Sequence, residues 1–155
     1  MTIHDRRAAR VLLVDATDRI LLLRGGDPAR PDLRYWFTPG GGLDDGEDPA
    51  TGAARELFEE TGLRVEPAEL GEPMWHEVAR FSYDSREYRQ EQEFYLYRVA
   101  SWQVDTAGFE AEERLVIDAY RWWSADELAA SDETIYPAGL DDLVRRCTGV
   151  PARGL

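Results

Sequence analysis

The sequence predicts a protein of the α/β or α+β class, with strands and helices packed in layers. Two observations lead to this prediction. Short runs rich in Val, Ile, Leu and aromatic residues recur along the chain, bounded by Gly, Pro or Asp. Between them lie segments with the apolar spacing and capping residues of helices. The length of 155 residues and the hydrophobic content of 43% suit one domain, residues 1–155, with its own core.

The first strands are expected in the N-terminal quarter of the chain. Residues 8–14 and 20–24 are apolar on both faces, which is typical of strands buried on two sides. We expect residues 25–34 to form a loop, because two prolines interrupt them. A short aromatic strand, residues 35–37, follows.

A helix is predicted for residues 49–61. Asp48 is a suitable N-cap, and Pro49 suits the first helical position. Gly62 can adopt the left-handed conformation that ends many helices. The sequence therefore predicts both ends of this helix.

Three carboxylates of this helix are candidate metal ligands. Glu56, Glu59 and Glu60 stand at i, i+3 and i+4, so one face of a helix carries all three. Such a trio alone is most often a solvated face. Here it follows a glycine run at residues 40–42, and carboxylate oxygens suit Mg²⁺ or Mn²⁺. Arg55 precedes Glu59 by four residues and can fix its rotamer.

The remainder of the chain is expected to complete the sheet and add two helices. A capping box at Ser124 opens the first of these helices, and apolar residues at helical spacing define the second. In order, the elements are strands at residues 63–65, 73–82, 88–99 and 115–123 and helices at residues 124–130 and 137–148.

The segment around the first helix matches the pattern G-x5-E-x7-R-E-U-x-E-E-x-G-U, where U is aliphatic. It agrees at all nine fixed positions, which are Gly41, Glu47, Arg55, Glu56, Leu57, Glu59, Glu60, Gly62 and Leu63. This pattern is the signature box of the Nudix hydrolases, and the chain resembles that superfamily. The resemblance implies an α/β/α sandwich with a mixed central sheet. It also implies hydrolysis of a diphosphate linkage in a nucleoside diphosphate joined to another group.

The resemblance assigns roles to the residues of the box. Glu56, Glu59 and Glu60 would bind Mg²⁺ or Mn²⁺, and Gly41 would contribute a backbone carbonyl or only the turn. One carboxylate, with Glu56 as a candidate, would act as the general base, and Arg55 would orient Glu59. The metal would neutralise the diphosphate and activate or position the attacking water.

Further acids and substrate contacts are expected outside the box. Members of the superfamily often use another acid, and Glu113 is our first candidate in the acidic turn at residues 108–113. Glu110, Glu112 and Glu93 are alternatives, although an acidic turn is more often simply solvated.

Four residues are candidates to bind the substrate itself. Arg24 and Arg34 could contact phosphate, and Phe81 and Tyr88 could stack on a base. The alternatives are an exposed surface arginine and a core aromatic residue. No subfamily marker follows the box, so the nucleoside diphosphate derivative is left open.

The composition of the chain limits the classes of partner that it can bind. The net charge of −13 argues against broad electrostatic binding to nucleic acid or to an anionic membrane. No apolar run is long enough for a membrane span, and the single cysteine, Cys147, fits a reducing compartment. We expect a cytoplasmic monomer or homodimer that acts on a small nucleotide-type diphosphate.

Two other functions on the same fold are alternatives. A catalytically silent nucleotide-binding or sensor module usually lacks box carboxylates, and all are present here. An isomerase of the isopentenyl diphosphate type needs a catalytic Cys and Glu pair, and Cys147 stands near the C-terminal end. Hydrolysis is therefore the leading prediction.

Overall fold

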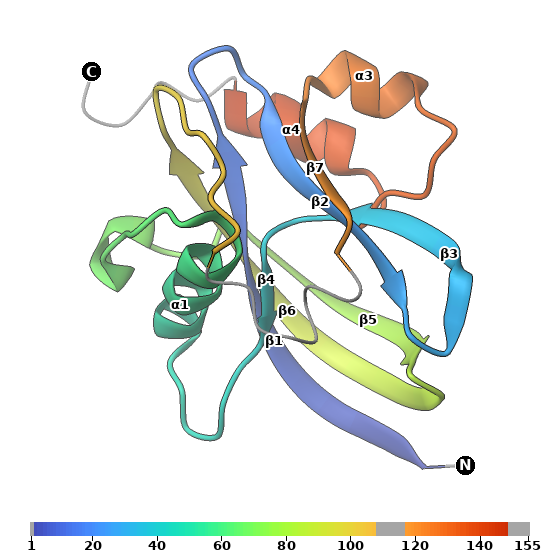
Figure 1. Ribbon diagram of the computed structural model, residues 1–155. Helices are drawn as coiled ribbons and strands as arrows, with labels where there is room; N and C mark the ends of the chain where they lie inside the picture. Colours follow the sequence, from blue (N-terminus) through green and yellow to red (C-terminus); the bar gives the residue numbers. More distant parts are fainter. Residues whose placement is uncertain (1, 108–116, 149–155) are drawn as a thin grey trace.

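The computed structural model describes residues 2–107 and 117–148. Within them a mixed sheet has the strand order β3-β2-β1-β6-β5, with β4 added to β1 and β7 added to β2 (Figure 1). In chain order, the elements are β1 (Ile3–Val14), β2 (Ile20–Asp27), β3 (Arg30–Phe37), β4 (Gly40–Gly42), α1 (Pro49–Thr61), η1 (Pro67–Leu70), β5 (Trp75–Tyr83), β6 (Arg86–Arg98), β7 (Ala119–Trp123), α3 (Ala125–Ala130) and α4 (Leu140–Thr148).

Strand β1 is the centre of the sheet. It pairs in parallel with β6 along its whole length and antiparallel with the short strand β4. It pairs with β2 only where Val14 faces Ile20. Strands β2, β3 and β7 therefore diverge from β1, β5 and β6 beyond the pair of Val14 and Ile20. Strand β4 lies on β1 beside the helix α1 (Figure 1).

Helices cover both sides of this sheet. Alternate residues of β1 contribute to two separate cores, because successive side chains of a strand point to opposite faces. Ala9, Val11 and Leu13 belong to the cluster that contains Leu57 of α1. Leu12 and Val14 belong to the cluster that contains Val144 of α4. The arrangement is the predicted α/β/α sandwich with a mixed central sheet (Figure 1).

The predicted ends of the first helix are confirmed. The helix runs from Pro49 to Thr61, and the Asp48 carboxylate accepts a hydrogen bond from the Thr51 backbone N–H. Gly62 has φ 77° and ends the helix. These ends follow from local chemistry alone, which is why the sequence predicts them well.

The loop predicted at residues 25–34 is wrong. Strand β2 continues to Asp27, and β3 begins at Arg30, so the segment is mostly a β-hairpin. Pro31 is the second residue of β3, which lies at one end of the strand order. An edge strand tolerates proline because its outer N–H groups need no partner strand.

The short strand predicted at residues 63–65 is also wrong. Leu63 and Val65 are buried in the core under α1 and lie outside any strand. Their apolar pattern reflects packing, not strand pairing.

The C-terminal elements are shorter than predicted, although both helices and the strand before them are present. The strand begins at Ala119, with residues 115 and 116 of the predicted range outside the described part of the chain, and the last helix begins at Leu140. Within the residues described, no helix has the length and apolar character needed to cross a membrane.

Candidate active site

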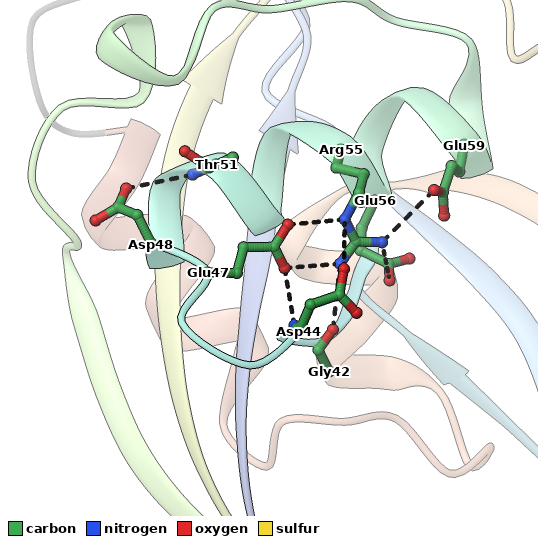
Figure 2. Close-up of polar contacts among 8 residues, drawn as sticks. All are labelled: Gly42, Asp44, Glu47, Asp48, Thr51, Arg55, Glu56 and Glu59. Carbon is green, nitrogen blue, oxygen red and sulfur yellow. Dashed lines mark hydrogen bonds and ion pairs between the residues drawn. The ribbon is translucent and has the colours of Figure 1, made fainter.

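The guanidinium of Arg55 lies at the centre of the candidate site (Figure 2). Its Nε and Nη2 atoms donate to the two carboxylate oxygens of Glu47, each at 2.9 Å. Its Nη1 atom lies 3.1 Å from Glu56 Oε1 and 3.5 Å from Glu59 Oε1. The same guanidinium lies 3.8 Å from Asp44 Oδ2, so one cation holds four carboxylates, and the bidentate bond to Glu47 is the shortest of these contacts.

Glu47 joins this cluster to the loop before α1. Its carboxylate also accepts a hydrogen bond from the Asp44 backbone N–H. The bonds from Arg55 hold the pKa of Glu47 below its usual value, and those same bonds raise the pKa of Arg55. Arg55 also donates to the carbonyl of Gly42. The pair therefore fixes the loop and the glycine strand to the helix.

Glu60 is placed differently from the other two carboxylates of the trio. It is only 2% exposed, and its Oε1 atom accepts a hydrogen bond of 2.7 Å from the Gly40 backbone N–H. The side chains of Glu56 and Glu59 are 15% and 23% exposed. Helical spacing predicts one shared face for all three carboxylates, but α1 is buried over a broad arc that includes Glu60.

Two glycines of β4 allow this close packing. A Cβ atom on Gly41 would lie 2.9 Å from Glu56 Oε1, so the carboxylate rests against the backbone. Gly40 has φ +142°, and a Cβ atom there would lie 2.4 Å from the carbonyl oxygen of Ala9. The absence of side chains at these positions brings the glycine backbone and the carboxylates together.

The chemistry of these donors suits a hard divalent cation, since all of them are oxygen atoms. Glu56 and Glu59 sit within reach of one guanidinium, and Glu56 lies on the backbone of Gly41. In the conformation of residues 2–107 and 117–148, no three His, Cys, Asp or Glu side chains are grouped closely enough to hold a metal. The donor type fits Mg²⁺ or Mn²⁺, and a bound ion would have to draw these carboxylates together.

The candidate phosphate-binding arginines share an acidic partner that the sequence did not predict. Arg24 Nε lies 3.9 Å from Asp118 Oδ1, and Arg34 Nε lies 3.4 Å from Asp118 Oδ2. Both side chains remain about one-third exposed. The structure thus brings the two arginines together at the β2–β3 hairpin.

The candidate aromatic residues Phe81 and Tyr88 stack on one another. Their ring centroids are 5.4 Å apart, with an angle of 23° between the planes. The guanidinium of Arg6 lies 5.8 Å from the Tyr88 ring centroid. These rings belong to the β5–β6 hairpin, in the other half of the sheet from the two arginines.

The acids expected outside the box are only partly described. Glu110, Glu112 and Glu113 lie outside the described residues. Glu93 on β6 accepts a hydrogen bond from the hydroxyl of Tyr95. Burial, with the charge of Glu93, raises the pKa of Tyr95 to about 12.

A polar network beside the glycine strand was not predicted from the sequence. Arg10, Gln92, Gln90 and Glu77 are joined by hydrogen bonds on β1, β5 and β6. Gln90 and Gln92 are 2% and 7% exposed. The available signal was the charge of Arg10, which interrupts the apolar run at residues 8–14.

Comparisons with known proteins agree with this geometry. The model of the NUDIX domain family matches residues 4–145. The chain is 30% identical over 131 residues to an RNA pyrophosphohydrolase of Rhodospirillum rubrum, covering 81% of this chain and 76% of that protein. It is 42% identical over 65 residues to an RNA pyrophosphohydrolase of Dinoroseobacter shibae, but this match spans only 39% of that protein.

Solved structures show the same fold. The crystal structure of a MutT protein from Methanosarcina mazei Go1 superposes with a TM-score of 0.62 and covers 96% of both chains. The sequence identity is 21%, so this likeness concerns the fold.

Proposed function

This chain belongs to the Nudix family, and from that membership we propose that it is a metal-dependent pyrophosphohydrolase. The proposed reaction is hydrolysis of a diphosphate linkage in a nucleoside diphosphate joined to another group. The observation that carries the proposal is the box cluster itself. One guanidinium holds Glu47, Glu56 and Glu59 beside the glycine strand (Figure 2). Glu60, on the same helix, accepts a hydrogen bond from the Gly40 N–H of that strand.

Glu56, Glu59 and Glu60 are the residues that would hold Mg²⁺ or Mn²⁺, with the carbonyl of Gly41 as a further oxygen donor. The ion would neutralise the diphosphate and lower the pKa of a bound water. Arg55 keeps Glu56 and Glu59 on one side of the helix, and Glu56 is the candidate general base. Glu113 is kept as a candidate for an additional acid.

The charge of the protein supports the need for a cation. The chain has a net charge of −13, and a diphosphate substrate is itself an anion. Without a divalent ion, the carboxylates of α1 would repel the substrate. The exposed parts of Arg24 and Arg34 offer cationic contacts to it, and Phe81 and Tyr88 offer flat apolar rings to a base.

Product analysis of the purified protein with Mg²⁺ tests the proposal. The panel holds dNTPs, ADP-ribose, nucleotide sugars, NADH, coenzyme A, dinucleoside polyphosphates and a 5′-triphosphorylated oligoribonucleotide. The last compound is included because relatives are named RNA pyrophosphohydrolases. It also tests our expectation that the partner is a small molecule and not a nucleic acid.

Glu59→Gln provides the decisive comparison. We expect cleavage of at least one compound at a diphosphate, and a loss of about 100-fold or more in kcat with Glu59→Gln, because a ligand of a catalytic metal is replaced by a neutral amide. Glu133→Gln is the matched control, since Glu133 is exposed beyond β7, in the segment between α3 and α4. Tight nucleotide binding without cleavage under Mg²⁺ or Mn²⁺ would instead support the sensor module.

A further inference from the structure

Arg10 lies in the middle of β1 at a position where three strands meet. It stands opposite Gly40 on β4 and opposite Phe94 on β6. Its neighbours Ala9 and Val11 are fully buried. Arg10 itself is partly buried, and a guanidinium that loses contact with water needs hydrogen bonds from the protein.

Two acceptors fix the guanidinium of Arg10. Its Nε atom donates to Gln92 Oε1 at 2.8 Å, and its Nη1 atom donates to the carbonyl of Thr38 at 3.0 Å. Gln92 is itself held, because its Oε1 accepts from Gln90 Nε2 and its Nε2 donates to Glu77 Oε1. The amide of Gln92 therefore keeps its oxygen toward Arg10.

Arg10 and Glu60 bind the same short segment, residues 38–40. Thr38 is two residues before Gly40, whose N–H donates to Glu60 Oε1 at 2.7 Å. A Cβ atom on Gly40 would lie 2.7 Å from Cγ of Arg10, so the side-chain stem of Arg10 packs directly on this glycine. Residues 38–40 are thus clamped between Arg10 on one side and Glu60 on the other.

The charged groups around Arg10 agree with its hydrogen bonds. Burial lowers the pKa of Arg10, and the charges of Glu60 and then Glu56 act in the opposite direction. The guanidinium therefore lies within electrostatic reach of two candidate metal ligands. Arg55 forms an ion pair with Glu56 on the helix, whereas Arg10 belongs to the sheet, opposite Gly40.

We propose that Arg10, held by Gln92, is a positioning residue that fixes residues 38–40 and thereby sets where Glu60 presents its carboxylate to the metal. The inference rests on the proposed metal-dependent function. Arg10 touches neither the metal nor the substrate in this assignment, and its effect passes through the backbone of Thr38 and Gly40. Partners of this kind commonly change metal affinity by 10–100-fold when they are replaced.

Two variants remove the clamp in different ways. Arg10→Lys keeps the positive charge but loses the planar fork that reaches two acceptors. Gln92→Leu keeps Arg10 but removes the acceptor of its Nε atom. We expect each variant to weaken Mn²⁺ binding, measured by calorimetry without substrate, by about 10-fold. The double variant should lose little more than the single ones, because both act on one contact.

Arg98→Lys is the matched control. Arg98 is another partly buried arginine, at the far end of β6, and it donates to the carbonyls of Asp15 and Cys147. Its replacement should lower the melting temperature as Arg10→Lys does, but leave the Kd for Mn²⁺ unchanged. Equal losses of Mn²⁺ affinity in Arg98→Lys and Arg10→Lys would overturn the inference, since general loosening would then explain both.

A second readout needs no metal. Hydrogen exchange of the Gly40 amide in the metal-free protein reports directly on its bond to Glu60. We expect exchange about 10-fold faster in Arg10→Lys and in Gln92→Leu than in the wild type. Wild-type exchange at Gly40 together with wild-type Kd in both variants would refute the role of Arg10. Failure of the wild type itself to bind Mn²⁺ would instead refute the proposed function, and the inference with it.

Discussion

At the scale of single residues, the bond between Glu47 and Arg55 makes a specific contribution to stability. Arg55 holds the pKa of Glu47 below its usual value of about 4.5, and the Glu47 side chain is only 11% exposed. A carboxyl whose pKa is lowered in the folded state stabilises that state above its unfolded pKa. This stability is lost as the pH falls below about 4.5 toward the folded pKa, where the proton removes the ion pair.

We therefore predict that Glu47→Gln loses stability in a pH-dependent way. At pH 7 the variant should be less stable than the wild type by roughly 1.5–3 kcal/mol, the usual range for hydrogen bonds to charged groups. The difference should shrink as the pH falls below 4.5. Urea unfolding of both proteins at pH 7, 5 and 3.5 measures it. A difference that stays constant over this range would show that the charge of Glu47 is not the cause.

The same scale shows what the sequence reveals and what it hides. The contact between Arg55 and Glu59 follows from helical spacing, because residues four apart are neighbours on a helix. The hydrogen bond from Gly40 to Glu60 joins residues 20 positions apart, and the bond from Arg10 to Gln92 joins residues 82 apart. Contacts of this kind depend on how the strands meet, which no local pattern specifies.

At the scale of elements, two neighbouring glycines of β4 should respond differently when a side chain is added. At Gly40 an added Cβ would meet the backbone of Ala9, which cannot move aside, and the φ of +142° is unfavourable for other residues. At Gly41 the added atom would meet the end of the Glu56 side chain, which can rotate away. The first change should therefore act on the fold and the second on the site.

We predict that Gly40→Ala destabilises the protein by about 2 kcal/mol or more, as strained backbone does. Gly41→Ala should stay folded, with a melting temperature close to the wild type, but lose about 10-fold or more of kcat/KM because Glu56 is displaced. Thermal unfolding and steady-state kinetics on the substrate found in the panel separate the two. A folded and fully active Gly41→Ala would remove Glu56 from the proposed machinery.

Elements also differ in how well the sequence predicts them. The ends of α1 and the capping box of α3 follow from residues adjacent in the chain, and both agree with the structure. The sequence does not predict the β2–β3 hairpin, because its prolines indicate a loop, although an edge strand can contain them. The hairpin depends on the pairing of β2 with β3 and on its place at the sheet edge, and a local sequence pattern does not specify either.

At the scale of the whole molecule, the excess of negative charge links metal binding to stability. The chain carries a net charge of −13, and four of its acidic side chains gather around Arg55 in the box. Repulsion among these charges opposes the compact state and is screened by any salt. A divalent ion bound at the box would add a stabilisation that depends on its own Kd.

We predict that MgCl₂ raises the melting temperature more than NaCl does at the same ionic strength. A ligand at 100 times its Kd stabilises the folded state by about 2.7 kcal/mol, which corresponds to roughly 5–10 °C for a chain of this length. Glu59→Gln should lose most of the difference between the two salts, while keeping the common rise that screening produces. Glu133→Gln should keep both. Equal rises with both salts in the wild type would mean that Mg²⁺ acts only by screening, and the carboxylates of α1 would then be a solvated face.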